Sequence, residues 1–319
     1  LTQNKMTVEK IYTNGRVLEV TGKGYSPLGD VFLDDKKVSA DDVQLRVLLL
    51  GAVLCNDANL FEEDGKWKIK GDPTEAALVV AAAKEGLQKD DLDQKYPRLG
   101  EIPFSSERKR MTTFNEGAIS DVFPADGSPV AFSKGAPEVI LGSCTKIHLN
   151  GKVKPLTPEL RQEIPEQVRK MADQALRVMA LSFRPLDGEF SSGKLSSEEF
   201  ADDIEKDMIF SGLMGMRDPP REEVKTAIRK CESAGIKTVM ITGDHKLTAS
   251  AIARELGILK ENDLSLTGTE LDKLSDSEFD DIVEKVSVYA RVYPIHKLRV
   301  VQALKKKGYV VAMTGDGVN

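Results

Sequence analysis

Cysteine is scarce in this 319-residue chain, and its placement excludes two classes of protein. The three cysteines, Cys55, Cys144 and Cys231, are far apart in the sequence and odd in number. Such spacing fits neither a disulfide framework nor a cysteine-based metal site. We therefore expect free thiols and a reducing compartment.

Long hydrophobic runs are lacking as well. No apolar stretch approaches the roughly 18 residues that a membrane-spanning helix requires, and no signal peptide begins the chain. The longest candidate, residues 47–55, is better explained as a buried helix. The chain begins without methionine and stops at Asn319 in the middle of a polar turn. We therefore expect both ends to be cut from a longer protein.

The chain also carries no excess of positive charge. Its 45 lysines and arginines against 51 aspartates and glutamates give a net charge of −6. This balance argues against nucleic acid as the main partner, although a local basic pocket for an anion is compatible with it. Hydrophobic residues make up 40% of the chain, which is an ordinary globular value. The length corresponds to roughly two domains.

The two parts of the chain differ in their pattern of secondary structure. Beyond residue 217, helices and strands alternate, which predicts an α/β fold with a parallel, doubly wound sheet. The expected elements there are helices at 222–234, 246–256, 275–283 and 296–307 and strands at 236–241, 287–290 and 309–313. The earlier part is expected to be α+β with hairpins. The rigid sequence Arg217-Asp218-Pro219-Pro220-Arg221 marks the boundary between them.

Local signals predict several elements of the earlier part. Asn14-Gly15 predicts a hairpin within residues 8–20. We expect Ser39 to cap a helix at 41–54, and Asp72 to cap a helix that begins at Pro73. The acidic, serine-rich residues 187–207 are interpreted as a solvated insertion or linker.

Two Thr-Gly-Asp sequences follow apolar runs that we interpret as strands. Thr242, Gly243 and Asp244 form the first, and Thr314-Gly315-Asp316-Gly317 contains the second. The carboxyl ends of parallel strands face the crevice in which ligands bind, and an exposed carboxylate such as that of Asp316 suits Mg²⁺. We interpret the pair as one polar site for phosphate and metal chemistry. A single such sequence would more simply be an ordinary Asp-Gly turn.

Lys297 is a further candidate, because it lies at the start of a predicted helix. A cation there opposes the helix dipole by up to roughly 1 kcal/mol. A bound anion would offset that cost, and the alternative is a solvated lysine at a frayed helix end. The three histidines, His148, His245 and His296, share no common spacing and receive no catalytic role.

Phe104 lies close in sequence to several cations. Lys109 and Arg110 follow it, and Lys134-Gly135 ends another predicted strand. A purine stacks on an aromatic face and lysine binds phosphates, so these residues fit a nucleotide pocket. The alternative is a core phenylalanine beside a solvated basic turn.

Taken together, six segments resemble, in the same order, the motifs of the main cytoplasmic loop of P-type cation-transporting ATPases. They are Leu1-Thr2-Gln3-Asn4-Lys5-Met6-Thr7, Lys134-Gly135-Ala136-Pro137-Glu138, Asp218-Pro219-Pro220-Arg221, residues 240–253, Ala290-Arg291-Val292-Tyr293-Pro294 and Thr314-Gly315-Asp316-Gly317-Val318-Asn319. They span essentially the whole chain. Residues 101–111 are most similar to the calcium-pump branch.

The resemblance implies a domain organisation and a cellular setting. Residues 7–216 would form an α+β nucleotide-binding (N) domain with an antiparallel sheet. It would be inserted into a haloacid-dehalogenase-like phosphorylation (P) domain made of residues 1–6 and 217–319. The family also implies ATP and Mg²⁺ as cofactors and a position on the cytoplasmic side of a membrane. The transmembrane and actuator domains of the same pump would be its partners, and membrane association would come only through such further segments.

The resemblance also implies two sets of site residues. The nucleotide site would consist of Glu75, Phe104, Lys109, Met111, Lys134, Gly135, Arg177 and Arg291, with Phe104 stacking on the adenine. The phosphorylation site would consist of Asp218, Thr242, Gly243, Asp244, Lys297 and Asn319, with Asp316 as the Mg²⁺ ligand. Thr242 and Lys297 would hold the transferred phosphoryl group.

One departure from the family pattern affects the expected activity. The nucleophilic aspartate of Asp-Lys-Thr-Gly-Thr would precede Leu1, and this motif is not in the sequence. Phosphoryl transfer depends on an in-line nucleophile. We therefore expect this chain to bind ATP without turning it over. The intact pump would couple ATP hydrolysis, through an aspartyl-phosphate, to transport of a cation. The similarity to the calcium-pump branch implies that this cation is Ca²⁺.

Two alternatives stay open at this point. One is a soluble dehalogenase-like phosphatase with a large cap domain, which would need a nucleophilic aspartate of its own. The other is a nucleotide-binding module without catalysis.

Overall fold

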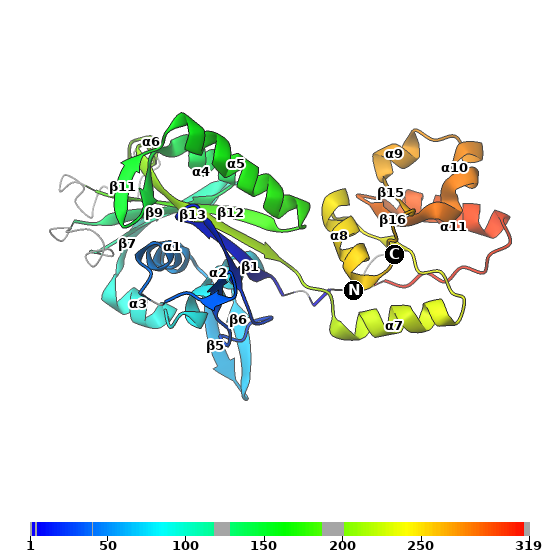
Figure 1. Cartoon of the computed structure of the whole chain (residues 1–319), viewed down its shortest axis with the longest axis horizontal. Helices are drawn as coiled ribbons and strands as arrows, with labels where there is room; N and C mark the ends of the chain where they lie inside the picture. Colours follow the sequence, from blue (N-terminus) through cyan, green and yellow to red (C-terminus); the bar gives the residue numbers. More distant parts are fainter. Residues whose placement is uncertain (1, 4, 40, 118–127, 187–200, 316–319) are drawn as a thin grey trace. The chain divides into compact units, whose positions relative to one another are not determined.

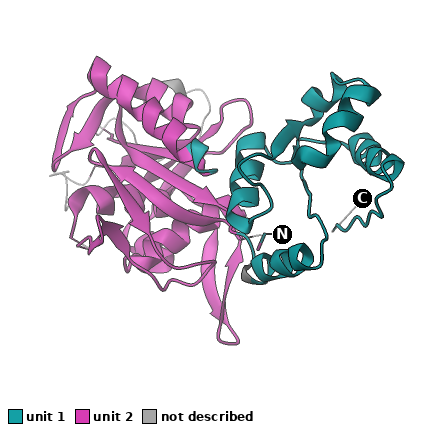
Figure 2. Ribbon diagram, turned by 45° about the vertical axis from the view of Figure 1, so that its right-hand side comes forward, with its two compact units in different colours: residues 1–2, 172–175, 220–319 teal, residues 3–171, 176–219 magenta. Residues whose placement is uncertain are grey.

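The computed structural model describes residues 2–3, 5–39, 41–117, 128–186 and 201–315. The chain divides into two compact units, coloured in Figure 2. Unit 1 comprises residues 1–2, 172–175 and 220–319, and unit 2 comprises residues 3–171 and 176–219.

The units divide a few residues away from the boundaries expected after residues 6 and 216. Backbone contacts explain this difference. Gln3 N donates to Pro219 O at 3.0 Å, and Lys5 N donates to Asp218 Oδ1 at 3.0 Å. These bonds join the segment before the first strand of unit 2 to the segment after its last strand, so residues 3, 5–6 and 217–219 lie with that unit.

Unit 2 is built on an eleven-stranded sheet (Figure 1). Nine strands follow the order β4-β3-β2-β1-β13-β12-β9-β8-β7, and β10 pairs with β13 and β11. The strands are β1 (Thr7–Thr13), β2 (Arg16–Val20), β3 (Val31–Leu33), β4 (Lys36–Lys37), β7 (Arg98–Ile102), β8 (Arg110–Asn115), β9 (Val130–Gly135), β10 (Cys144–Leu149), β11 (Lys152–Pro155), β12 (Arg177–Pro185) and β13 (Met208–Arg217). Only the β10–β13 pairing is parallel among the described strands of this sheet. The β1–β2 hairpin turns at Asn14-Gly15, as predicted.

Helices cover both faces of this sheet (Figure 1). On one face lie α1 (Val43–Leu54), α2 (Pro73–Lys84) and α3 (Lys89–Lys95), and on the other lie α4 (Pro137–Ser143) and α5 (Pro158–Asp173). The alternation of side chains along each strand accounts for the two layers. Ile11 belongs to the core on the α1 face, whereas the next residue, Tyr12, belongs to the core on the α5 face.

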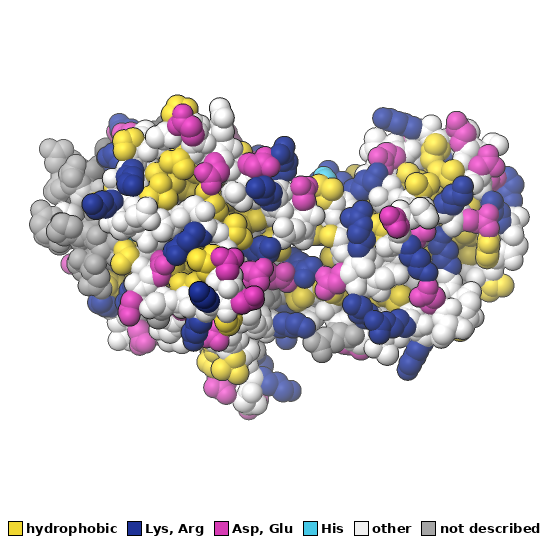
Figure 3. Space-filling view, in the orientation of Figure 1, with side chains coloured by type: hydrophobic (Ala, Val, Ile, Leu, Met, Phe, Trp, Pro, Cys, Tyr) yellow, Lys and Arg dark blue, Asp and Glu magenta, His cyan; other side chains and the backbone are white. Residues whose placement is uncertain are grey.

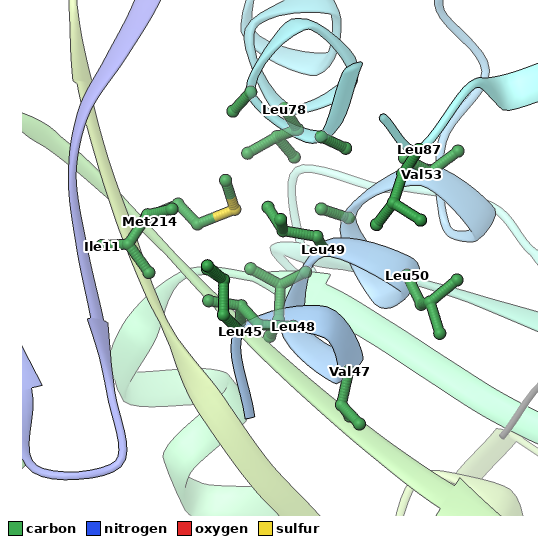
Figure 4. Close-up of a cluster of buried hydrophobic side chains, with 14 of the residues drawn as sticks. Ile11, Leu45, Val47, Leu48, Leu49, Leu50, Val53, Leu78, Leu87 and Met214 are labelled. Atoms are coloured by element: carbon green, nitrogen blue, oxygen red, sulfur yellow. The ribbon is translucent and has the colours of Figure 1, made fainter. Parts of the chain in front are cut away.

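Helix α1 lies at the centre of the larger core (Figure 4). Leu45, Leu48 and Leu49 are at most 2% exposed and lie near Met214 of β13 and Leu78 of α2. A helix that is apolar on every side is expected to be buried, so the prediction of a buried helix at 47–55 is confirmed.

The caps of the first two helices were predicted with different success. Asp72 accepts from Thr74 N at 2.7 Å and α2 begins at Pro73, as predicted. The prediction that Ser39 caps α1 was wrong. The helix begins at Val43, and the side chain of Asp42 accepts from Leu45 N at 3.0 Å. An aspartate immediately before the first turn reaches the free N–H groups, which a serine three residues earlier does not.

Two features of unit 2 lie outside the main sheet. A separate hairpin of β5 (Asn59–Glu63) and β6 (Lys66–Lys70) projects at the bottom of Figure 3 and carries hydrophobic, acidic and basic side chains. A short helix, α6 (Ala201–Ile204), precedes β13. Residues 187–200 of the predicted solvated insertion lie outside the described residues. At its end the prediction was wrong, because Glu205 is only 2% exposed and forms ion pairs with two arginines.

Unit 1 contains a parallel three-stranded sheet with the order β14-β16-β15. The strands are β14 (Met240–Ile241), β15 (Leu264–Thr267) and β16 (Val286–Ala290). The helices are α7 (Glu222–Ser233), α8 (Lys246–Leu256), α9 (Gly268–Asp272), α10 (Asp276–Ile282) and α11 (Pro294–Lys306), with a 3₁₀ turn at Val283–Lys285. The parallel sheet and its helices agree with the predicted α/β fold.

Two predicted strands of unit 1 are corrected. The strand expected at 236–241 is reduced to β14, and Ile236 is 58% exposed. Residues 309–313 form no strand, and the Val310 side chain is fully exposed. A strand requires partners for its backbone N–H and C=O groups. Within the described part of the chain, β14 pairs only with β16, and no strand pairs with the other edge of β14. The apolar composition of residues 309–313 was therefore not enough to form a strand.

All three cysteines are free thiols, and Cys55 and Cys144 are buried. Among the helices in the described ranges, none is both long and apolar enough to cross a lipid bilayer.

Candidate functional site

Lys134 and Glu75 form an ion pair at the centre of the first candidate site, in unit 2. Lys134 lies near the end of β9 and is 4% exposed. Its Nζ lies 2.5 Å from Glu75 Oε1 and also donates to the carbonyl oxygen of Cys55. Glu75 lies in the first turn of α2, and its Oε2 accepts from Asp57 N at 3.3 Å. Because a buried ammonium is unfavourable without partners, this pair holds the start of α2 against β9.

Gly135 leaves room for the end of the loop that carries Phe104. A Cβ atom at Gly135 would lie 2.4 Å from the carbonyl oxygen of Lys109, and that oxygen accepts from Ala136 N at 3.0 Å. Lys109 has a φ of 51°, in the left-handed region. Any side chain at position 135 would therefore displace Lys109, whose own side chain is exposed.

The loop between β7 and β8 presents Phe104 to solvent. The Phe104 side chain is 61% exposed, so the alternative of a core phenylalanine is excluded. Met111, at the start of β8, is 2% exposed and pairs with Lys134 across the β8–β9 ladder. Met111 thus belongs to the core behind the site, whereas Phe104 offers an open ring.

Arg177 joins this set through α2. It begins β12, and its Nη1 donates to Thr74 Oγ1 at 3.3 Å, next to Glu75 in the chain. The predicted nucleotide residues of unit 2 are thus linked by contacts or by the short loop between β7 and β8. They are Glu75, Phe104, Lys109, Met111, Lys134, Gly135 and Arg177. Arg291, the eighth, lies in unit 1.

Burial also affects the one thiol in this region. Burial raises the pKa of the Cys55 thiol, although the positive charge of Lys134 opposes the shift. The thiol therefore stays protonated near neutral pH and is not a nucleophile.

The Thr242-Gly243-Asp244 turn of unit 1 is organised by its own hydrogen bonds. Thr242 Oγ1 donates to Asp244 Oδ2 at 3.0 Å and accepts from Asp244 N at 3.1 Å. Thr242 N donates to Tyr289 O of β16 at 2.9 Å, and Arg291 N donates to Asp244 O at 3.1 Å. The turn after β14 is therefore fixed to the turn after β16, which brings Thr242, Asp244 and Arg291 together.

Lys297 lies in the first turn of α11 and is half-buried. The preceding residue, His296, is 5% exposed and determines how the helix begins. His296 Nδ1 accepts from Tyr293 N at 3.0 Å, and its Nε2 lies 2.9 Å from Asp272 Oδ1. A Cβ atom on Gly268 would lie 2.8 Å from the His296 ring. This structural role of His296 could not be predicted from local sequence, because Asp272 is 24 residues away.

One residue predicted for the phosphorylation site belongs to the other unit, and two lie outside the described residues. Asp218 lies in unit 2, where it accepts from Lys5 N. Asp316 and Asn319 lie outside the described residues, so the proximity of Asp244 and Asp316 stays a prediction. Within the described ranges, no group of three or more histidine, cysteine or acidic side chains has an arrangement that would hold a metal ion.

Glu205 is a buried residue that sequence analysis missed. Its carboxylate pairs with Arg108 and Arg110, which flank Lys109. The sequence offered no clear signal, because Arg108 precedes β8 and the left-handed φ of Lys109 breaks the alternation of side chains along a strand. Glu205 also lies about a hundred residues away from Arg108, inside an acidic run that resembles a solvated segment.

Two family models and several curated relatives match this chain. A family model described as P-type ATPase, cytoplasmic domain N, matches residues 44–223. A second, described as haloacid dehalogenase-like hydrolase, matches residues 145–319. The calcium-transporting ATPase of Bacillus subtilis is 42% identical over the whole chain, which corresponds to 34% of that relative's length.

Two further relatives match in the same way. Calcium-transporting ATPase 1 of Lactococcus lactis is 42% identical and calcium-transporting ATPase 1 of Bacillus cereus is 43% identical, each over the whole chain and over 32% of the relative's length. The chain thus spans about a third of the length of these curated relatives.

Proposed function

The chain belongs to the P-type ATPase family, and from this premise we propose that unit 2 binds ATP while unit 1 carries the phosphoryl-transfer site of a cation pump. Unit 2 then corresponds to the N domain and unit 1 to the P domain. The observation that carries the proposal is the exposed ring of Phe104 on the short loop of unit 2 that also carries Lys109.

The residues of unit 2 fit a nucleoside triphosphate. Stacking of a base on an exposed aromatic ring contributes about 1–3 kcal/mol, and Phe104 offers such a ring. Lys109 and Arg177 are exposed cations for the phosphates. Lys134 and Glu75 form a hydrogen-bonded pair at the site. Met111 and Gly135 lie in the strands behind this pair. In this arrangement the base binds at Phe104 and the phosphates extend toward the cations.

We propose that Thr242, Gly243, Asp244 and Lys297 of unit 1 receive the γ-phosphate and that Asn319 belongs to the same site. The Thr242 hydroxyl would turn its single hydrogen from Asp244 Oδ2 to a phosphoryl oxygen while still accepting from Asp244 N. Lys297 adds positive charge at a helix start. Carboxylates at such a site fit Mg²⁺, and Asp316 is the proposed ligand. When bound, the ion neutralises phosphate charge.

The function of the whole protein follows as a proposal from its relatives. ATP hydrolysis through an aspartyl-phosphate would drive transport of a cation, and the names of the relatives favour Ca²⁺. The transmembrane and actuator domains of the pump would be the partners, with these two units on the cytoplasmic side. A soluble dehalogenase-like phosphatase is not favoured, because the relatives that match the whole chain are named as cation pumps.

Titration calorimetry with ATP on the 319-residue chain tests the nucleotide site. We expect Phe104→Ala to weaken ATP binding about 10-fold or more, because stacking is lost. Phe61→Ala on the β5–β6 hairpin is the matched control, since that ring is 40% exposed and lies outside the proposed site. Equal affinities of wild type and Phe104→Ala, or equal losses in both variants, would contradict the proposal.

The phosphoryl-transfer proposal has its own test. The sequence holds no Asp-Lys-Thr-Gly-Thr, so incubation of this chain with γ-labelled ATP and Mg²⁺ should leave no acid-stable label on the protein. Stoichiometric acid-stable labelling would show that another residue accepts the phosphoryl group.

A further inference from the structure

We propose that Glu205 is a positioning residue for the nucleotide, because its buried carboxylate fixes the loop that presents Phe104. This inference rests on the ATP site proposed for unit 2 and adds to that site a residue from a distant part of the chain.

The carboxylate of Glu205 is surrounded by donors. Its side chain is 1% exposed, and its Oε2 lies 2.7 Å from Nη2 of Arg110. Its Oε1 accepts from Arg108 and, at 2.5 Å, from Thr112 Oγ1. Thr112 is in turn bonded to Ser133 Oγ at 2.6 Å. One carboxylate therefore pairs with two guanidinium groups and is linked by hydrogen bonds to Thr112 of β8 and, through it, to Ser133 of β9.

Arg108 connects the Glu205 carboxylate to the backbone next to Phe104. While one nitrogen of its guanidinium binds Glu205, Nη1 donates to the carbonyl oxygen of Pro103 at 3.1 Å. That carbonyl belongs to the peptide bond that leads into Phe104. The backbone N–H of Arg108 also donates to Ser105 Oγ at 3.2 Å. Arg108 thus spans the loop and joins the buried carboxylate to the backbone beside the exposed ring.

Glu205 is itself held rigidly from its own side. Arg184 Nη1 of β12 donates to the carbonyl oxygens of Asp203 at 2.9 Å and Lys206 at 2.8 Å, on either side of Glu205. Ile204 is 1% exposed and packs in a core cluster with Ile102, at the end of β7. The anchor therefore belongs to the folded sheet, although the segment before it is acidic and serine-rich.

Removal of the negative charge should release the loop without removing the site. In Glu205→Gln, Arg108 and Arg110 lose their common counter-ion and repel each other. Arg108 then turns toward solvent and the Pro103 carbonyl loses its donor. Phe104 would still be present, but it would have to be ordered when the base binds, which lowers affinity.

A double-mutant cycle on the full chain, with ATP as the probe in titration calorimetry, tests this inference. We expect Glu205→Gln to weaken ATP binding about 10-fold in the wild-type background and less than about 2-fold in the Phe104→Ala background, because the two residues act through one loop. Asp203→Asn is the matched control. Asp203 is two residues away, and its ion pair with Lys206 is exposed, so we expect unchanged binding.

The outcomes separate this inference from the function on which it rests. Equal factors in the two backgrounds, or no effect of Glu205→Gln where Phe104→Ala does weaken binding, would overturn the positioning role alone. A wild-type chain that does not bind ATP would overturn the proposed function and this inference with it. Thermal unfolding checks that each variant folds. If Glu205→Gln does not fold, Arg108→Gln keeps the Glu205–Arg110 pair and must show the same dependence on Phe104.

Discussion

The two units hold their candidate site residues in different ways. In unit 2, the Lys134 and Glu75 side chains are 5% and 18% exposed and lie between a helix and a strand of a large sheet. In unit 1, Lys246, two residues after Asp244 in the chain, forms an ion pair with Glu270 that is not itself a candidate site pair, and the two side chains are 31% and 45% exposed. Buried partners fix side chains, whereas exposed pairs leave them free to exchange with water. The site proposed for unit 2 therefore contains an ion pair held by buried partners, whereas the site proposed for unit 1 is a turn fixed mainly through its backbone.

The largest expected effect is a loss of stability that is confined to the core of unit 2. Leu48→Ala should lower the free energy of unfolding of unit 2 by about 3–5 kcal/mol, because Leu48 is fully buried in the larger core and its truncation leaves a cavity. Native-state hydrogen exchange should report the loss in β12 and leave β16 of unit 1 unchanged. An equal loss of protection in β16 would contradict the view that each unit has its own core.

A second prediction compares the two ion pairs directly. Lys134→Met should lower the stability of unit 2 by about 3 kcal/mol, because it leaves Glu75 and the Cys55 carbonyl without their donor. Lys246→Met, the matched variant in unit 1, should cost less than about 1 kcal/mol. Urea unfolding followed separately in each unit measures both values. Equal losses of stability in the two variants would contradict the view that the buried ion pair of unit 2 is held more firmly than the exposed pair of unit 1.

The dependence of stability on pH gives a third, smaller effect. Burial lowers the pKa of Lys84 from its ordinary value of 10.5 to about 8. Between pH 8 and 10 the unfolded chain therefore binds more protons than the folded chain, and the stability of unit 2 should rise with pH in this window. Because Lys84 is only half-buried, we expect a gain of about 1 kcal/mol.

The control for this effect is Lys84→Met, which should flatten the rise. The ammonium of Lys84 donates to the carbonyl oxygens of Thr21 at 2.6 Å and Gly22 at 3.2 Å, so the variant also loses these bonds at every pH. A rise of the same size in Lys84→Met would assign the effect to another group.

The smallest effect concerns thiol reactivity and leaves stability unchanged. Burial raises the pKa of the Cys144 thiol to about 12, and both Cys144 and Cys55 are fully buried. Cys231 in α7 of unit 1 is half-exposed. A thiol reagent should therefore label Cys231 of the native chain first, as peptide mass spectrometry can show. Labelling of Cys55 at the same rate would mean that the core of unit 2 opens readily.

Local signals in the sequence were sufficient where a structure depends on neighbouring residues. The Asn14-Gly15 turn and the Asp72–Pro73 helix start formed as predicted, because a turn type or a cap is decided within a few residues. The α/β alternation after residue 217 likewise predicted the parallel sheet of unit 1. The exposure of Phe104 was not decided by such signals, because the sequence was equally compatible with a core phenylalanine.

Structure that depends on distant partners was not predictable in the same way. Residues 309–313 have the composition of a strand, but a strand exists only where another strand pairs with it. Glu205 was assigned to a solvated segment because its partners, Arg108 and Arg110, lie in a different part of the sequence. The partner of Lys134 was also not identifiable from spacing, since Glu75 is 59 residues away.

The most direct test of the nucleotide site proposed for unit 2 is an NMR titration of the whole chain with ATP. We predict saturable shifts of the backbone amides of Phe104, Lys109 and Gly135 at ATP concentrations that leave the amides of Thr242 and Asp244 unchanged. Shifts confined to the Thr242 turn, or no saturable shift in the β7–β8 loop, would contradict the account.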